Sequence, residues 1–250
     1  FHLEEPPLCV TLPAKMLHIW QVSGEELATI PAQQLSSVKA LKRELQRCCG
    51  LSRFRQRLLQ DGSALDDMSM LEGTSDLQLV LLPFSSASQQ QADELADAAG
   101  EGEVSLVEEL LQRPLDPDAN DRNGETPLYR ASLVGSTETA RLLLEAGADF
   151  DLACGQHHLT ALVVASGLGH VDTVRVLLQA GADQDKRCSG ICGSDEGSKF
   201  LREVGLEEDQ IDAICGQDGV TALGAAASHG EVTTMRLLLE SRPYHSAVHV

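Results

Sequence analysis

The sequence predicts a small α+β roll followed by an all-α repeat solenoid. From about residue 92, a unit made of a turn, a short helix, a glycine and a second helix recurs along the chain. Residues 16–84 instead hold strand-like alternation of apolar and polar residues around one amphipathic helix. Aromatic residues make up only 3% of the chain, which suits repeats packed from alanine and leucine.

The repeat is clearest after the turn Asn123-Gly124. Thr126 can cap a helix start, Pro127 fits the first helical position, and Leu128 begins the buried face. Small residues, a glycine and a leucine pair follow at fixed offsets, and the same offsets recur around three other leucines: Leu95, Leu162 and Leu223. The four anchors lie 33, 34 and 61 residues apart, and 61 is one period of 33 plus 28 further residues.

These residues resemble the ankyrin repeat, most clearly at Thr126-Pro127-Leu128, Thr160-Ala161-Leu162 and Thr221-Ala222-Leu223. The resemblance implies stacked helix pairs that bind a protein partner. Binding would use the turn tips, or fingers, and the exposed positions just after each anchor leucine. On this sequence the implied positions are Arg122, Asn123, Glu125, Tyr129 and Arg130; Gln156, His157, His158, Val163 and Val164; and Gln217, Asp218, Gly224 and Ala225.

The ends of the repeat array depart from the pattern. We expect four repeats over residues 92–250, and the first, about 92–113, is strongly acidic and lacks the Thr-Pro-Leu start, as an N-terminal cap would. The 28-residue insertion at about 186–213 is expected to pack on neighbouring repeats or to form a lid that contacts a partner. Residues 85–91 are expected to be a polar linker.

The N-terminal part has its own element order. Residues 16–22 and 27–30 are expected to pair as a hairpin, residues 38–47 to form a helix, and residues 57–60 and 77–82 to form further strands. Residues 1–15 hold three prolines and are expected to be a flexible segment. Because the chain begins with phenylalanine, we expect a longer precursor or a fragment.

Two stretches, Arg57-Leu58-Leu59-Gln60-Asp61-Gly62 and Asp76–Leu81, together with this element order, resemble ubiquitin. The resemblance covers residues 16–84 and implies a β-grasp roll. Leu82-Pro83-Phe84 stands where ubiquitin has its diglycine tail, so we expect a built-in ubiquitin-like domain and not a conjugated tag. Ubiquitin's apolar recognition face would correspond to Leu59 and Val80, with Arg57 beside them, and Ser23 or Gly24 replaces its third apolar position. The alternative is that these are ordinary exposed side chains.

The net charge of −19 is concentrated in the repeats. Residues 85–250 hold 11 basic and 28 acidic residues, a balance of −17, whereas residues 16–84 hold 7 and 8. This negative field disfavours nucleic acid and anionic lipid and favours a basic protein partner, although it also serves solubility. The chain has no apolar run of 18 residues, so we expect no membrane span. Its seven cysteines form no paired framework, so we expect free thiols and a cytoplasmic location that can include the nucleus.

Candidate chemistry in the sequence is weak. Cys188, Cys192 and Cys215 lack the spacing of a zinc site, and the loop from Asp116 lacks the glycine and the glutamate of a calcium loop. No nucleotide-binding or hydrolase motif occurs. We therefore expect no metal, no cofactor and no catalysis, and favour a non-enzymatic interaction scaffold. The alternatives are a ubiquitin-pathway adaptor that links a substrate to the proteasome or a ligase, and a regulatory piece of a larger enzyme.

Overall fold

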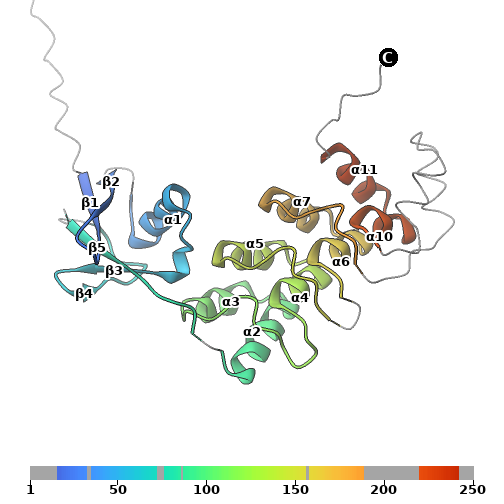
Figure 1. The fold of residues 1–250 in the computed structure, drawn as a ribbon, viewed down its shortest axis with the longest axis horizontal. Coiled ribbons are helices and arrows are strands. Elements are labelled where there is room, and N and C mark those ends of the chain that lie inside the picture. The colour runs from blue at the N-terminus through green and yellow to red at the C-terminus, as the bar shows by residue number, and fades with distance from the viewer. Residues whose placement is uncertain are drawn as a thin grey trace, which may run out of the picture. The chain divides into compact units, whose positions relative to one another are not determined.

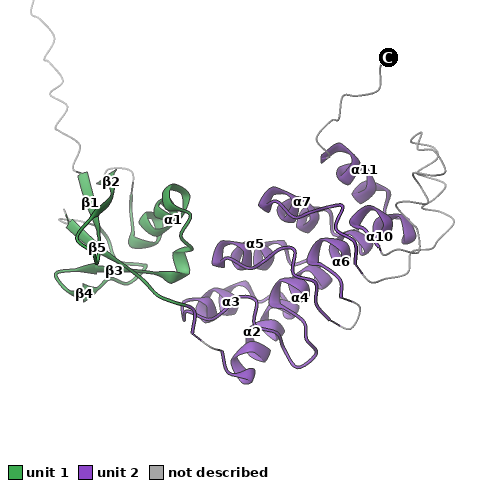
Figure 2. Cartoon of the chain, viewed as in Figure 1, with its two compact units in different colours: residues 1–83 green, residues 84–250 purple. Residues whose placement is uncertain are grey.

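The computed structural model describes residues 16–32, 35–71, 76–85, 87–155, 158–188 and 220–241. The chain divides into two compact units, residues 1–83 and 84–250 (Figure 2), which are described separately below. The expected flexible segment 1–15 lies outside the described residues, and so does the expected insertion 186–213 apart from its first three residues.

The N-terminal unit is built on a mixed five-stranded sheet. Its strands are β1 (Met16–Gln21), β2 (Glu26–Pro31), β3 (Gln56–Gln60), β4 (Ser63–Ala64) and β5 (Asp76–Leu81). They lie in the order β2-β1-β5-β3-β4. The pair of β1 and β5 is parallel, and the other neighbours are antiparallel. The first and last strands of the unit therefore meet at the centre of the sheet (Figure 1).

Helix α1 (Val38–Cys49) packs its apolar side on one face of this sheet. The Ser37 side chain accepts a hydrogen bond from the Ala40 N–H and so begins the helix, and Gly50 ends it in the left-handed conformation. A short 3-10 turn, η2 (Arg53–Arg55), leads into β3. The buried core of the unit comprises Leu17, Ile19, Ile30, Val38, Leu41, Leu45, Leu58, Leu71, Leu77 and Leu79.

The second unit is a stack of helix pairs. The described pairs are α2 (Gln89–Glu101) with α3 (Val104–Leu111), α4 (Pro127–Val134) with α5 (Thr137–Ala146), α6 (Ala161–Gly167) with α7 (Val171–Ala180), and α10 (Ala222–Ser228) with α11 (Val232–Ser241). The first helices of successive pairs pack on one another, and so do the second helices (Figure 1). The buried core therefore runs continuously along the stack.

Threonine caps start three of these helices at the predicted positions. The hydroxyl oxygens of Thr126, Thr160 and Thr221 each accept a hydrogen bond from the N–H three residues later. Helix α2 starts differently, because Ser88 and Gln91 form a reciprocal capping box. The helix consequently begins at Gln89, inside the segment 85–91 that the sequence suggests is a linker.

None of the helices in the described part of the chain combines the length and the apolar composition that crossing a bilayer requires.

Candidate functional site

The finger between α3 and α4 is shaped by a single buried carboxylate. Asp121 is only 8% exposed, and its Oδ1 accepts hydrogen bonds from the N–H groups of Asn123, at 2.8 Å, and Glu125, at 2.9 Å. The Gly124 N–H closes the turn by donating to the Asp121 carbonyl oxygen. This arrangement leaves Arg122 and Asn123 exposed at the tip.

Arg122 is held from the side by the preceding repeat. Its Nε lies 2.7 Å from Oδ2 of Asp93 on α2, and its backbone N–H donates to Oδ1 of the same carboxylate. A hydrogen bond from Gln89 and the contacts with Arg122 lower the pKa of Asp93. The exposed guanidinium is therefore anchored at one edge and accessible at the other.

Arg130 lies among three carboxylates. Its Nη2 is 3.1 Å from Oδ1 of Asp97, and its Nη1 is 3.4 Å from Oε2 of Glu125 and 4.0 Å from Oδ2 of Asp121. The Arg130 side chain is 25% exposed and that of Glu125 is 20% exposed. These two predicted binding residues are therefore largely occupied in fastening the first repeat to the second.

Three other predicted binding residues are part of the core. Tyr129, Val163 and Val164 are 8%, 3% and 7% exposed, which corrects the prediction that they lie on an exposed face. Tyr129 and Val164 pack with Cys154 and Leu159. The equivalent Gly224 and Ala225 on α10 are also buried. Neighbouring first helices pack closely, so these positions lie between neighbouring repeats.

Burial also fixes the protonation of the groups in this cluster. It raises the pKa of the Tyr129 hydroxyl, to which the nearby Glu125 carboxylate adds, and it raises the pKa of the Cys154 thiol. Both groups therefore stay protonated at neutral pH, and Cys154 behaves as a small apolar side chain 3.6 Å from the Thr126 hydroxyl.

The next finger adds one exposed predicted residue. His158 is exposed and has a positive φ of 47°. The Gly155 N–H donates to the Gly124 carbonyl oxygen at 2.9 Å, which ties this finger to the previous one. Four predicted binding residues, Gln156, His157, Gln217 and Asp218, lie outside the described residues. Arg122, Asn123 and His158 are therefore the accessible members of the predicted set within the described residues.

A ladder of aspartates links the bases of the fingers. Both carboxylate oxygens of Asp118 accept the Asp149 N–H, at 3.0 and 3.1 Å, and Oδ1 of Asp151 accepts the Asp183 N–H at 3.0 Å. Burial raises the pKa of Asp118 to about 6, and the neighbouring Asp116 and Asp149 carboxylates add to the effect. These oxygens serve backbone N–H groups, and nowhere in the described ranges do three His, Cys, Asp or Glu side chains form a metal-binding group.

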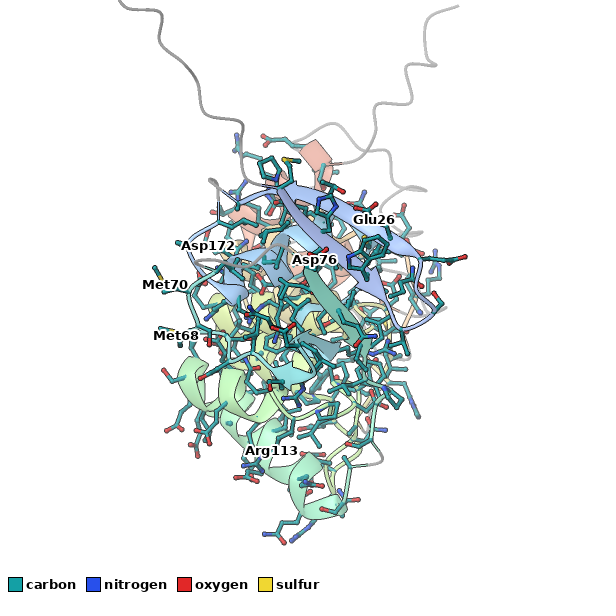
Figure 3. All side chains as sticks on the ribbon, turned by 90° about the vertical axis from the view of Figure 1, so that its left-hand side faces the viewer. Glu26, Met68, Met70, Asp76, Arg113 and Asp172 are labelled. Carbon is teal, nitrogen blue, oxygen red and sulfur yellow. The ribbon has the colours of Figure 1, made fainter. Side chains whose placement is uncertain are left out.

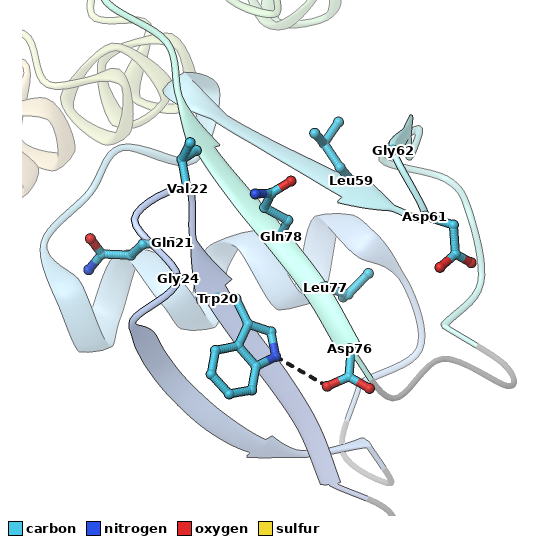
Figure 4. Close-up of a pocket in the computed structure, with 10 residues that line it drawn as sticks. All are labelled: Trp20, Gln21, Val22, Gly24, Leu59, Asp61, Gly62, Asp76, Leu77 and Gln78. Atoms are coloured by element: carbon cyan, nitrogen blue, oxygen red, sulfur yellow. Dashed lines mark hydrogen bonds between the residues drawn. The ribbon is translucent and has the colours of Figure 1, made fainter.

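The exposed face of the N-terminal sheet carries the other predicted set. Arg57 on β3 pairs with Val80 on β5, and Leu59 pairs with Gln78. Arg57 is exposed, whereas Leu59 and Val80 are partly buried. In the first turn, next to Ser23 and Gly24, Val22 is an apolar residue and is 67% exposed. Val22 and Leu59 line the same hollow (Figure 4). The position of Val22 directly after β1 was the signal in the sequence that could have identified it as an exposed apolar residue.

Comparison with known proteins shows what the repeats are similar to. Residues 95–188 match the family model described as Ankyrin repeats (3 copies). The Ankyrin repeat and KH domain-containing protein of Caenorhabditis briggsae is 26% identical over 182 residues, which are 68% of this chain and 6% of that protein. The human Ankyrin repeat, SAM and basic leucine zipper domain-containing protein 1 is 35% identical over 83 residues, 33% of this chain and 17% of that protein. The chain thus spans less than a fifth of the length of either relative.

Proposed function

Because residues 95–188 are ankyrin repeats, which generally mediate protein binding, we propose that this chain is a non-enzymatic scaffold that binds a protein partner at its fingers. The observation that carries the proposal is the exposure of Arg122, Asn123 and His158 on fingers whose backbones are fixed by internal hydrogen bonds. A loop that is already ordered loses little conformational entropy when a partner binds. Neither nucleic acid nor a membrane is part of this proposal.

The charge of the repeats defines the partner's chemistry. With −17 over residues 85–250, the unit attracts a partner that is basic overall. Arg122 places one positive charge at a finger tip, so a hydrogen-bond acceptor of the partner would contact that tip. Cationic groups of the partner would contact the acidic helices around it. Association of this kind weakens as the salt concentration rises.

Site-directed cross-linking of the full chain tests the proposal. A photoreactive benzophenone amino acid replaces Asn123 at the finger tip, and in a matched variant it replaces Arg175, which is exposed on the second helix of the third pair. We expect a discrete protein adduct in cells from position 123, reduced at high salt in lysate and absent from position 175. Identical products from both positions, or none from position 123, would refute finger binding.

A second candidate, a ubiquitin-pathway adaptor, depends on the N-terminal unit. We propose that this unit is a ubiquitin-like domain, supported by its strand order β2-β1-β5-β3-β4 and by the helix between β2 and β3. Arg57, Leu59, Val80 and Val22 offer its receptor a surface of mixed apolar and basic character. In this role the domain engages a proteasomal or ligase receptor while the repeats hold a substrate. The reducing cytoplasm or nucleus suits either candidate, since the described cysteines are thiols.

A further inference from the structure

A hollow on the exposed face of the N-terminal sheet combines an aromatic ring, an aliphatic side chain and carboxylates. Trp20 on β1, Leu59 on β3, and Asp61 in the turn after β3 line it, together with Asp76 and Gln78 on β5. Figure 4 shows the indole beside the Asp76 carboxylate and Leu59 on the neighbouring strand beyond Gln78. Three strands and one turn therefore contribute to a single concave site.

The strand register fixes the layout of the hollow. Trp20 pairs with Gln78, and Gln78 pairs with Leu59, so these three residues form one row across β1, β5 and β3. The indole Nε1–H donates to Oδ1 of Asp76 at 3.1 Å. On the same strand the His18 ring stacks near the indole, with centroids 6.5 Å apart and planes inclined by 26°. The aromatic ring is therefore held in place by its neighbours.

The charged residues that line the hollow are carboxylates. None of the ten described residues that line the hollow is basic, and Asp61 and Asp76 are both exposed. Glu26, which pairs with Trp20 on the other side, adds a further carboxylate at the edge of the hollow. Hydrogen bonds with Thr29 and His18 lower its pKa, and its Oε1 lies 2.6 Å from Nδ1 of His18. Figure 3 shows Glu26 and Asp76 on the same side of the sheet.

Arg57, an arginine on this face, does not line the hollow. It lies on β3 two residues before Leu59 and pairs with Val80. The hollow is thus an acidic and aromatic site beside a basic position. An anionic ligand would meet carboxylates there, whereas a cation would gain both Coulomb attraction and contact with the indole face.

We propose that this hollow binds an arginine side chain of a partner polypeptide. The planar guanidinium can stack on the Trp20 indole while its N–H groups donate to the Asp61 and Asp76 carboxylates. The aliphatic stem of the arginine then packs on Leu59. The inference concerns the N-terminal unit alone and is independent of finger binding by the repeats. The hollow shares Val22 and Leu59 with the receptor surface proposed above, but binding of an arginine side chain does not require a ubiquitin-pathway receptor, so each proposal can fail without the other.

The single tryptophan gives a direct readout. Trp20 is the one tryptophan in the chain, so a ¹⁵N-labelled sample of all 250 residues gives one indole N–H resonance. The probe is the peptide acetyl-Gly-Arg-Leu-Gly-amide, and its match carries citrulline, a neutral residue of the same shape, in place of arginine. We expect saturable shifts of the indole resonance with the arginine peptide, with a dissociation constant in the millimolar range. The citrulline peptide is expected to cause no saturable shift.

Carboxylate variants distinguish binding in the hollow from non-specific attraction of a cationic peptide to an acidic protein. Asp61→Asn and Asp76→Asn should each weaken binding about threefold, the scale of an exposed ion pair. Asp66→Asn removes the same charge from an exposed residue outside the hollow and should leave the affinity unchanged. Equal shifts from the citrulline peptide, equal weakening by Asp66→Asn, or no saturable shift with the arginine peptide would overturn the proposal.

Discussion

Arg130 Nη2 of the second repeat lies 3.1 Å from Asp97 Oδ1 of the first. The same guanidinium reaches Glu125 and the nearly buried Asp121, whose side chain is 5% exposed. One cation therefore connects the first helix of the atypical N-terminal repeat with the carboxylate that shapes the first finger. Terminal repeats have a neighbour on one side only, so such a connection stabilises the repeat most prone to fray.

Replacing this cation should loosen the first repeat. Arg130→Met keeps the aliphatic contact and leaves three carboxylates without their shared partner. We expect the free energy of unfolding to fall by about 1–2 kcal/mol, since one of the carboxylates is buried. The decrease in the urea midpoint measures the loss. Relative to the native chain, the variant should increase amide hydrogen exchange more in α2 than in α6.

Arg141→Met is the matched control for this variant. Arg141 lies 3.9 Å from Glu138 on the same helix, and the two side chains are 49% and 70% exposed. An ion pair of this kind contributes less than about 0.5 kcal/mol. If both variants shifted the urea midpoint equally, Arg130 would have no special role in holding the first repeat.

The turn glycine of the second repeat should tolerate no side chain. Gly135 has a φ of +74°, and a Cβ there would lie 2.5 Å from Nδ1 of His170 in the next repeat. Gly135→Ala should therefore lower the free energy of unfolding by about 2–3 kcal/mol, from backbone strain plus displacement of the imidazole. Thermal unfolding measures this loss.

Gly147→Ala separates backbone strain from the clash. Gly147 also ends a helix with a positive φ, +99°, but a Cβ there meets nothing within 4 Å. We expect a loss of roughly 1–2 kcal/mol from strain alone. A loss at Gly147 as large as that at Gly135 would show that contact with His170 contributes nothing.

The sequence predicts features that depend on local chemistry and misses those that depend on the neighbouring repeat. Thr126 and Thr160 mark helix starts because capping needs only their own hydroxyls and the next turn. The burial of Tyr129 and Val163, in contrast, depends on how closely successive first helices approach, which the repeat pattern does not encode. The capture of Arg130 by Asp97 likewise joins residues 33 positions apart.

The pH dependence of stability should include a contribution from Asp118. Its pKa of about 6 in the folded chain exceeds the ordinary value of 3.8, so between these pH values the folded state binds more protons than the unfolded state. Stability therefore falls as pH rises through this window. At pH 7.5, Asp118→Asn should raise the free energy of unfolding by about 1 kcal/mol after allowance for solvent screening, and the gain should vanish below pH 4.

Asp172→Asn provides the control with the opposite sign. Asp172 is exposed in the first turn of α7, where free N–H groups favour a negative charge. Its replacement should lower stability by a few tenths of a kcal/mol at pH 7.5. Urea midpoints at pH 7.5 and 4 compare the two variants, and a loss of stability in Asp118→Asn at pH 7.5 would contradict the assigned cost of burying its charge.

The adaptor function can be tested with two substitutions on the exposed face of the N-terminal sheet. Leu59 and Val80 are partly buried on the sheet face, so Leu59→Ala with Val80→Ala removes apolar contact area at a cost to stability of about 1–2 kcal/mol in total. If this face engages a receptor, the full chain should co-sediment with purified proteasomes, and the double variant should bind at least about tenfold more weakly. Val134→Ala, at a 48% exposed position on the repeats, should bind as the native chain does. Undiminished binding by the double variant, or no co-sedimentation of the native chain, would contradict a proteasomal role for this face of the N-terminal unit.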